Sequence, residues 1–523
     1  MAIQRAFRAA LVLLLLGVSG CVGVSRTSGV RQVHQEITTA RGDVPMFVTP
    51  GDSAASDARV AELLAAPLTS SAAVQVAFLR NPLVLEAYAR LGVSQADVVS
   101  ASRIANPVIS GSIITGAGER QAIGGIAQPI TDLLLLSARK RLAAGAYERT
   151  QHLVAASLLD LSRDAEGAWY RYVSAEQVSA MRQAVARAAD VSATLSQRFF
   201  DAGNINELEL ALDRAGAAQA RLAAMRAAAD ARRAKYDLQQ RMGLSGDPTW
   251  HALRELPAPL PVDEPLESLV ARAHDQRFDL VAARREVTIL ADALKLAKRW
   301  RWLGTVEVGL QRERETDGRV LTGPTLALAL PIFNQGQAGI ARADAQLNAS
   351  RARLAALELA EDNAVRLGLE RLAAAHQVAE EYRRSLVPER ELVVKRQQER
   401  ENFMLIGQFE LLLSKQQQYD AYQGYLEAIR DYWLARVDLA RAVGGELPSS
   451  AATDPAVGVE AILTPPVDSM EHMNHTHDSP PANPKKPAAA KDVADDMSGM
   501  PGMSPPQTGS PPHHPTSPRG HQP

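Results

Sequence analysis

The chain has 523 residues, with 57 Lys and Arg against 59 Asp and Glu, so its formal net charge is −2 at pH 7. This length allows more than one domain, and the near-neutral balance argues against a nucleic-acid-binding protein, which normally carries a basic surplus. The single cysteine excludes an intramolecular disulfide and a Cys-rich metal site. Because the sequence contains no nucleophile elbow, HExxH motif, P-loop or dinucleotide-binding glycine motif, we expect no enzyme.

The first residues have the features of a secretory signal peptide. A cationic start, Arg5 and Arg8, precedes an apolar run from Ala9 to Gly17 that is too short to span a bilayer. Small residues stand directly before Cys21, a pattern similar to a lipobox, in which the cysteine is acylated, for example with palmitate. Cys21 is therefore the predicted lipid attachment site, and an ordinary signal peptide with an incidental cysteine is the alternative. Because Val22 follows, and not Asp, we expect anchoring in the outer membrane.

An internal duplication is the most informative feature of the sequence. Three pairs of short motifs recur in the same order at offsets of 201 or 202 residues: Gln128-Pro129-Ile130 and Leu330-Pro331-Ile332, Glu209-Leu210 and Glu410-Leu411, Met242-Gly243-Leu244 and Val443-Gly444-Gly445. The predicted domains are a signal peptide (1–20), a lipid-anchored extended segment (21–67), a first repeat (68–270), a second repeat (271–447) and a disordered Met-, His- and Pro-rich tail (448–523).

Each repeat is predicted to hold a helix, two strands and two very long helices. The first helix covers Leu83 to Ile104, and its counterpart covers Leu280 to Trp300. Later spans are rich in good helix formers, and no proline occurs between Pro129 and Pro248. A helix of about 60 residues is on the order of 90 Å long, far beyond ordinary globular helices. Pro388 interrupts the second long segment, and we favour a static kink there over a functional hinge.

Apolar residues at coiled-coil spacing predict the packing of the last helix. We interpret this seam as the core of a helix bundle: Tyr419, Tyr422, Leu426, Ile429, Trp433, Val437 and Ala440.

Alternation of apolar and polar residues predicts the strands, at 305–311 and 326–332 in the second repeat and at 108–115 and 122–130 in the first. We expect 312–319 to be an exposed hairpin loop. Such strands are long enough to cross an outer membrane, but four cannot close a barrel, which needs at least eight. Beyond the signal peptide, no apolar stretch approaches the roughly 20 residues of a membrane-spanning helix. A chain that crosses the membrane must therefore form an oligomeric β-barrel.

The segment Arg198 to Leu208, the segment Gly323 to Asn334 and the duplicated order of elements resemble the outer-membrane efflux factor (TolC-like) family, in its heavy-metal branch. The resemblance covers roughly Leu68 to Pro448. It implies a mainly α fold with a small β part: a duplicated long-helix coiled-coil unit, with four strands per chain in a trimeric, twelve-stranded outer-membrane barrel. A periplasmic α-helical tunnel would continue the barrel and meet a periplasmic adaptor and an inner-membrane transporter.

The resemblance also implies that the two turns between the long helices are periplasmic tips. Alignment of the repeats places Met404 opposite Gly203, so we expect the two tips not to be equivalent. Plain helix-connecting turns are the alternative to an adaptor contact. The predicted adaptor-contacting residues are Asp201, Ala202, Gly203, Asn204, Ile205, Met404, Leu405, Ile406, Gly407, Gln408 and Phe409.

The tail after Pro448 is rich in Pro, Gly, Ser and Ala and is predicted to be disordered. Its candidate metal ligands are Met470, His472, Met473, His475, His477, Met497, Met500, Met503, His513, His514 and His521. Thioether sulfur selects Cu(I) or Ag(I), and imidazole accepts Cu(II) or Zn. We therefore hypothesise Cu(I)/Cu(II) binding by the tail, with zinc, cobalt or cadmium next and low-complexity drift as the alternative, and we expect no required cofactor.

These features predict an outer-membrane channel subunit of a tripartite efflux pump, lipid-anchored and extending into the periplasm, that exports copper, silver or other heavy-metal cations. Two other functions stay open. The same duct could serve drug efflux or type I protein secretion. A periplasmic adaptor lipoprotein would also be long-helical, but it should contain β-rich halves around a single helical hairpin.

Overall fold

The computed structural model describes residues 29–41, 53–116, 119–246, 248–260 and 264–447, and for Gln408 and Phe409 it describes the backbone alone. Cys21, the predicted signal peptide and the predicted metal-binding tail lie outside these residues. None of the described helices combines the length and the apolar character that a membrane-spanning helix needs.

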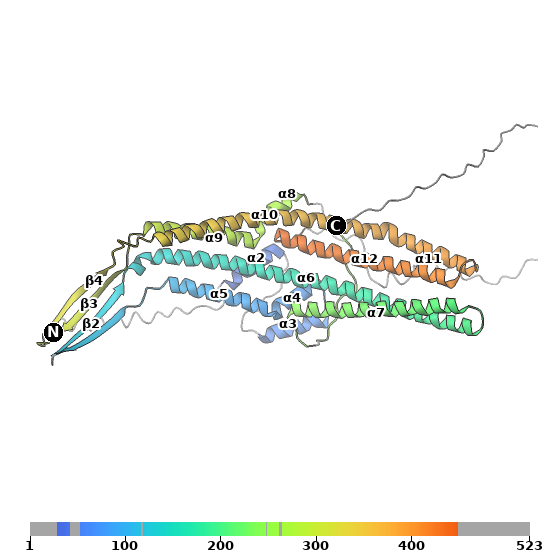
Figure 1. Ribbon diagram of the computed structural model, residues 1–523, viewed down its shortest axis with the longest axis horizontal. Coiled ribbons are helices and arrows are strands. Elements are labelled where there is room, and N and C mark those ends of the chain that lie inside the picture. The colour runs from blue at the N-terminus through green and yellow to red at the C-terminus, as the bar shows by residue number, and fades with distance from the viewer. Residues whose placement is uncertain (1–28, 42–52, 117–118, 247, 261–263, 448–523) are drawn as a thin grey trace, which may run out of the picture. The chain divides into compact units, whose positions relative to one another are not determined.

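Two copies of one unit make up most of the described chain (Figure 1). The first copy comprises α4 (Ser70–Arg80), α5 (Pro82–Ala101), β1 (Val108–Gly116), β2 (Glu119–Pro129), α6 (Thr131–Asp201) and α7 (Glu207–Met242). The second comprises α8 (Leu266–Gln276), α9 (Phe278–Arg299), β3 (Val306–Arg314), β4 (Val320–Leu328), α10 (Gln337–Glu381), η2 (Tyr382–Leu386), α11 (Val387–Asn402) and α12 (Gln408–Val443). The mainly α fold with a small β part is confirmed, and α4 and α8 are additional short helices that the sequence analysis missed.

Capping residues define the ends of the helices, and the C-caps of α7 and α12 match. Asn81, between α4 and α5, accepts a hydrogen bond from the Leu83 amide at 2.9 Å, which satisfies one of the free donors at the start of α5. Helix α7 ends at Gly243 with φ of 72°, and α12 ends at Gly444 with φ of 79°. Glycine adopts this left-handed conformation at helix ends with little strain. The two glycines are 201 residues apart, as the duplication predicts.

A single antiparallel sheet, in the order β1-β2-β3-β4, joins the copies. The joint is the pairing of β2 with β3, in which Ile126 lies opposite Leu310. Strand β3 extends further than predicted, so Arg312 and Arg314 belong to the strand and not to the loop. The loop is closed by a hydrogen bond from the Glu315 amide to the Arg319 carbonyl at 2.9 Å.

Aromatic side chains from both copies pack between the long helices. Tyr170 of α6 stacks on Trp433 of α12 with ring centroids 5.2 Å apart. The Tyr432 hydroxyl donates to the Leu260 carbonyl at 2.5 Å, so this buried polar group is satisfied. The predicted seam of α12 is buried from Tyr422 to Ala440, and Tyr419 is half-buried. The coiled-coil spacing therefore predicted the core correctly.

Arg163 of α6 is a buried charge, with 2 % of its surface exposed. Its Nη1 donates to Glu446 at 2.9 Å and to Glu166 at 3.1 Å, and its Nη2 donates to the Gly445 carbonyl at 3.2 Å. Two carboxylates and a carbonyl thus compensate its desolvation. The contact fixes the end of α12 against the first copy.

The segment 21–67 is not extended where it is described, which corrects the prediction. It forms α2 (Val30–Arg41) and α3 (Ser53–Ala65). Val30, Val33 and Ile37 recur at helical spacing and are buried, and α2 packs on α6. Apolar spacing of this kind was the signal for a helix that the sequence analysis overlooked.

Helix α2 also brings a histidine to the first copy. The ring Nε2 of His34 lies 3.1 Å from the hydroxyl of Tyr88 on α5. Burial lowers the pKa of His34 to about 4, because the charged imidazolium loses hydration there.

A second correction concerns the predicted boundary between the repeats, 270/271, which falls inside α8.

The long helical segment from α10 to α11 in the second copy contains a π-helical turn, η2, which ends two residues before Pro388. Pro388 is the second residue of α11, where its missing N–H is tolerated, and α11 continues from α10 in Figure 1. The Tyr382 ring of this turn lies against Gly424 of α12, where an added Cβ would come within 2.5 Å of the Tyr382 hydroxyl oxygen. A side chain at position 424 would therefore displace the ring.

Candidate functional site

The four-stranded sheet has two chemically different faces, because directly paired residues of antiparallel strands share a face. We define the aliphatic face by the side that carries Ile109, Ile113, Ala122, Ile126, Val306, Val308, Leu310, Leu326 and Leu328. Several of these side chains are exposed, with Ile109 at 80 % and Leu326 at 71 %. The opposite, mixed face combines small and apolar residues with Ser110, Ser112, Gln121, Gln311 and Thr325.

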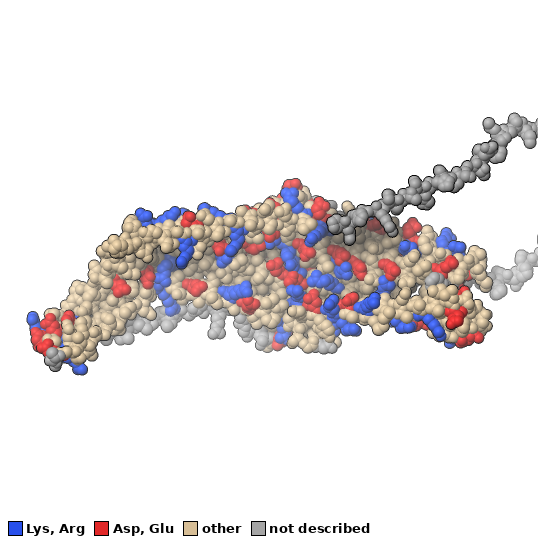
Figure 2. Space-filling model, viewed as in Figure 1, with Lys and Arg blue, Asp and Glu red and all other residues tan. Residues whose placement is uncertain are grey.

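The two faces of the sheet carry charges of opposite sign. The register places the three strand arginines, Arg120, Arg312 and Arg314, on the aliphatic face. It places the three strand glutamates, Glu119, Glu307 and Glu313, on the mixed face, where Glu313 accepts a hydrogen bond from Gln121. In Figure 2 the strands are mostly uncharged except at their loop end.

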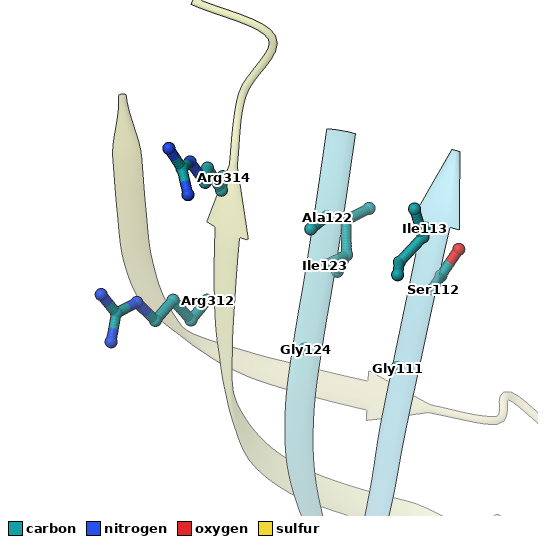
Figure 3. A pocket seen from close by; sticks show the side chains of 8 residues that line it. All are labelled: Gly111, Ser112, Ile113, Ala122, Ile123, Gly124, Arg312 and Arg314. Carbon is teal, nitrogen blue, oxygen red and sulfur yellow. The ribbon is translucent and has the colours of Figure 1, made fainter. Parts of the chain in front are cut away.

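A pocket of about 660 Å³ lies over the loop half of the sheet (Figure 3). Arg312 and Arg314 extend from β3 on one side of it, and Ile113 extends from β1 on the other. Gly111 and Gly124 form part of its floor, and open space surrounds the position where either glycine would carry a Cβ.

The two hairpin tips have the same backbone, which corrects the prediction that they differ. In the first tip the Asn204 amide donates to the Phe199 carbonyl at 2.8 Å, and Gly203 has φ of 75°. In the second tip the Leu405 amide donates to the Arg400 carbonyl at 2.9 Å, and Met404 has φ of 57°. Met404 is the only described residue other than glycine with a positive φ. The two copies therefore share one turn, with glycine at its left-handed position in the first tip and methionine there in the second.

The predicted tip residues are brought together at one end of the hairpins. Asn204 and Ile205 line the same pocket, of about 450 Å³, as Met404, Ile406 and Gly407. Asp201, Ala202 and Gly203 are exposed beside it. In the second tip 93 % of Met404 and 68 % of Leu405 are exposed, and the backbone of Gln408 and Phe409 begins α12.

Sequence reasoning missed four polar residues that line this tip pocket: Ser196, Glu209, Asp213 and Glu401. Asp213 of α7 is 7 % exposed and accepts a hydrogen bond from the Ser196 hydroxyl of α6. Asp213 interrupts the buried stripe between Leu210 and Ala217. A carboxylate within a helical packing stripe was the signal that could have identified it.

Sheet and tips lie at opposite ends of one helix. Helix α6 starts two residues after β2 and runs for 71 residues to the first tip. At 1.5 Å per residue this helix is roughly 105 Å long. The described residues contain no cluster of three or more His, Cys, Asp or Glu that could hold a metal.

Comparison with known proteins identifies the fold. No protein-family model and no curated protein matches the sequence. Among solved structures, CusC, a protein that forms a transmembrane channel, is 14 % identical with a TM-score of 0.61, and the match covers 72 % of this chain and 92 % of CusC. The outer-membrane protein VceC of Vibrio cholerae is 13 % identical with a TM-score of 0.60, covering 72 % and 97 %. The Neisseria gonorrhoeae channel MtrE, solved in its open state, is 16 % identical with a TM-score of 0.54, covering 72 % and 88 %. The fold is thus that of TolC-like outer-membrane channels.

Proposed function

We propose that this protein is the outer-membrane channel subunit of a tripartite efflux pump and works as a homotrimer. The sheet with one exposed aliphatic face is the observation that carries the proposal. An aliphatic band suits contact with lipid acyl chains, and the mixed face suits a water-filled lumen. The similarity of the fold to solved outer-membrane channels supports the same reading.

The sheet edges require association with other chains, and the resemblance to the efflux channel family implies that three chains associate. Within the described chain, β1 and β4 each pair on one side only. In lipid every backbone N–H and C=O group needs a partner, so β4 of one chain must pair with β1 of the next. Three chains with four strands each would close a barrel of twelve strands. The long helices then continue the barrel as a periplasmic tunnel.

Two substitutions on neighbouring residues of β4 test the membrane assignment. Leu326→Asp puts a charge on the aliphatic face, and Thr325→Asp puts the same charge on the mixed face. We expect Leu326→Asp to reduce insertion into planar bilayers at least tenfold, because a carboxylate facing lipid is costly. Thr325→Asp should insert and shift the conductance toward cations. Equal insertion of the two variants contradicts the proposed orientation of the sheet.

At the tips we propose contact with a periplasmic adaptor that connects to an inner-membrane transporter. The exposed side chains of Met404 and Leu405 support this, because a solvated apolar tip is stabilised by a partner. Leu405→Asp should weaken co-purification of a cross-linked adaptor. Leu222→Asp is the matched control, since Leu222 is an exposed leucine of α7 away from the tips. An equal loss in both variants would count against the tip contact.

For the anchor we propose acylation of Cys21 and retention in the outer membrane. The lipobox-like sequence supports it. Radiolabelled palmitate should label the intact protein and leave Cys21→Ser unlabelled, and membrane fractionation should follow the label. Labelling of Cys21→Ser at the level of the intact protein would refute this anchor.

Copper and silver are the cargo that we propose, with other heavy-metal cations next. Soft Met and His ligands in the tail support this, and the glutamates of the mixed face would favour cations inside the barrel. Removal of residues 470–523 should lower copper tolerance several-fold and leave drug tolerance unchanged. If drug tolerance falls and copper tolerance does not, drug efflux replaces metal efflux as the function.

A further inference from the structure

The three strand arginines form a basic cluster, here called the arginine patch, on an otherwise aliphatic surface. Arg312 and Arg314 are two positions apart on β3, so their Cα atoms lie about 7 Å apart on one face. The register puts Ala122 opposite Arg314, and Arg120 is two positions further along β2 toward the loop. All three arginines therefore lie on the loop half of the same face of the sheet.

The protein itself leaves these charges available. No hydrogen bond or ion pair joins Arg120, Arg312 or Arg314 to another residue in the described part of the chain. The nearest strand acid, Glu313, points to the opposite face and binds Gln121. An unpaired guanidinium on a surface that contacts apolar groups is unfavourable without an anionic partner. The patch thus lacks an anion of its own.

The pocket beside the patch has room for an apolar group. Its floor is Gly111, Ala122 and Gly124, its far wall is Ile113, and its volume is about 660 Å³. Arginine binds phosphate oxygens in a bidentate manner, and a small-residue trough accepts an acyl chain. The combination fits a molecule that carries both phosphate and acyl chains.

The position along the strands selects the leaflet. Arg312 is six residues, or roughly 20 Å, from the start of β3 next to the helices. The aliphatic band from Val306 to Leu310 fills that interval. If the helices are periplasmic, as the proposed function on which this inference rests requires, the arginine patch lies at the outer leaflet.

We propose that the arginine patch and its trough bind a phosphorylated, acylated lipid of the outer leaflet. The guanidinium groups of Arg312 and Arg314 hold the lipid phosphate, Arg120 adds charge at the loop end, and one acyl chain lies along Gly111 and Gly124. The bound lipid would neutralise the patch and seal the outside of the barrel wall at this height.

The test uses the full-length protein in detergent, with phosphorylated lipid A, its dephosphorylated form and inorganic phosphate as three separate probes. Phosphorylated lipid A should raise the midpoint of thermal unfolding, and the other two probes should not. Arg312→Gln/Arg314→Gln should bind lipid A at least tenfold more weakly, because two charge-assisted contacts are lost. Arg312→Lys/Arg314→Lys, which keeps the charge, should retain part of the binding and controls for folding.

Arg351→Gln/Arg353→Gln is the matched control, because it removes two exposed arginines at the same spacing from α10. This variant should bind lipid A as the unchanged protein does. Equal effects of the two double Gln variants overturn the inference, and so does an equal response to inorganic phosphate or to dephosphorylated lipid. Bilayer conductance of the unchanged protein separates this failure from failure of the proposed function. Conductance with no arginine-dependent lipid binding removes only the inference, whereas absence of insertion removes both.

Discussion

The two hairpin tips form one turn with different residues. Gly203 adopts a left-handed conformation without strain, whereas Met404 adopts it with a Cβ that crowds the backbone. At the opposite ends of the same hairpins, Gly243 and Gly444 both remain glycine. The difference lies in the surroundings. Open space surrounds position 203, but the backbone of Arg80, the last residue of α4, and of Asn81 lies against Gly243. A close contact thus adds to the left-handed conformation at Gly243 and Gly444, whereas at Gly203 only the conformation favours glycine.

The largest expected effect tests this distinction at the hairpin ends. A Cβ at Gly243 would lie 2.6 Å from the Asn81 Cα, and a Cβ at Gly444 would lie 2.7 Å from the Arg277 Cγ. Because main chain yields less than a side chain, Gly243→Ala should lower the free energy of unfolding by about 3 kcal/mol and Gly444→Ala by about 2 kcal/mol. Denaturant unfolding in detergent measures both.

Gly246 supplies the control for these two variants. It has φ of 79°, and nothing lies within 4 Å of its added Cβ. Gly246→Ala should therefore show the conformational strain alone, about 1 kcal/mol. A loss at Gly246 as large as that at Gly243 would mean that close contact is not what retains the glycine.

A smaller effect is expected where the second hairpin contains its π-helical turn. Gly424→Val should displace the Tyr382 ring and cost about 2 kcal/mol. The equivalent position of the first hairpin is Ala223, and Ala223→Val should cost roughly 0.5 kcal/mol, the difference in helix propensity. Thermal unfolding of the two variants gives the comparison. Similar losses of stability in the two variants would show that the Tyr382 ring moves freely and that the two hairpins are equivalent at this position.

The next largest change in the free energy of unfolding is expected from exchanging the residues at the two tips. Met404→Gly should raise the free energy of unfolding by about 1 kcal/mol, because the strain is relieved and the exposed side chain loses few contacts. Gly203→Met should lower it by a similar amount, and the double exchange should be near neutral. Met404→Leu, which keeps a Cβ, serves as control and should change little. Stabilisation by Met404→Leu equal to that of Met404→Gly would exclude strain as the cause.

A further expected effect concerns pH and separates the first copy from the second. The unfolded chain protonates His34 near pH 6.5, but the folded chain resists protonation until about pH 4. The unfolded state therefore binds more protons between these values, so stability should fall as pH decreases from 6.5 toward 4 and be unaffected above 6.5. His34→Gln should reduce this slope in denaturant unfolding measured across the window. An unchanged slope would assign the pH dependence to other groups.

Sequence patterns predicted the elements that depend on local periodicity. The long helices, the seam around Ile429 and three of the four strands follow from residue spacing and were found near the expected positions. The fourth strand was expected at 326–332 but lies at Val320–Leu328, so its prediction was wrong. The pairing of β2 with β3 joins residues almost 200 positions apart, so no local pattern contains it. The side of the sheet on which Arg312 lies required that register. Helix α2 was missed because three apolar residues in twelve are a weak pattern outside the duplicated unit.

The candidate site, too, could be predicted only in part from the sequence. The tip residues were predicted from the resemblance, and the structure places the described ones around one pocket. The shared backbone of the tips was not predicted, because residue type at position 404 argued for a different turn. Only hydrogen bonds such as the one from Leu405 to Arg400 reveal that the turn was kept.

The open edges of β1 and β4 also affect how the chain can fold. A sheet with unpaired N–H and C=O groups on both sides offers two templates for any passing strand, including the wrong one. Correct closure therefore competes with aggregation, and its rate rises with the number of nearby copies. The β2–β3 pairing reduces this exposure, since it combines the four strands of one chain into a single sheet. In the proposed trimer, the duplication thus halves the number of open edges that assembly has to close.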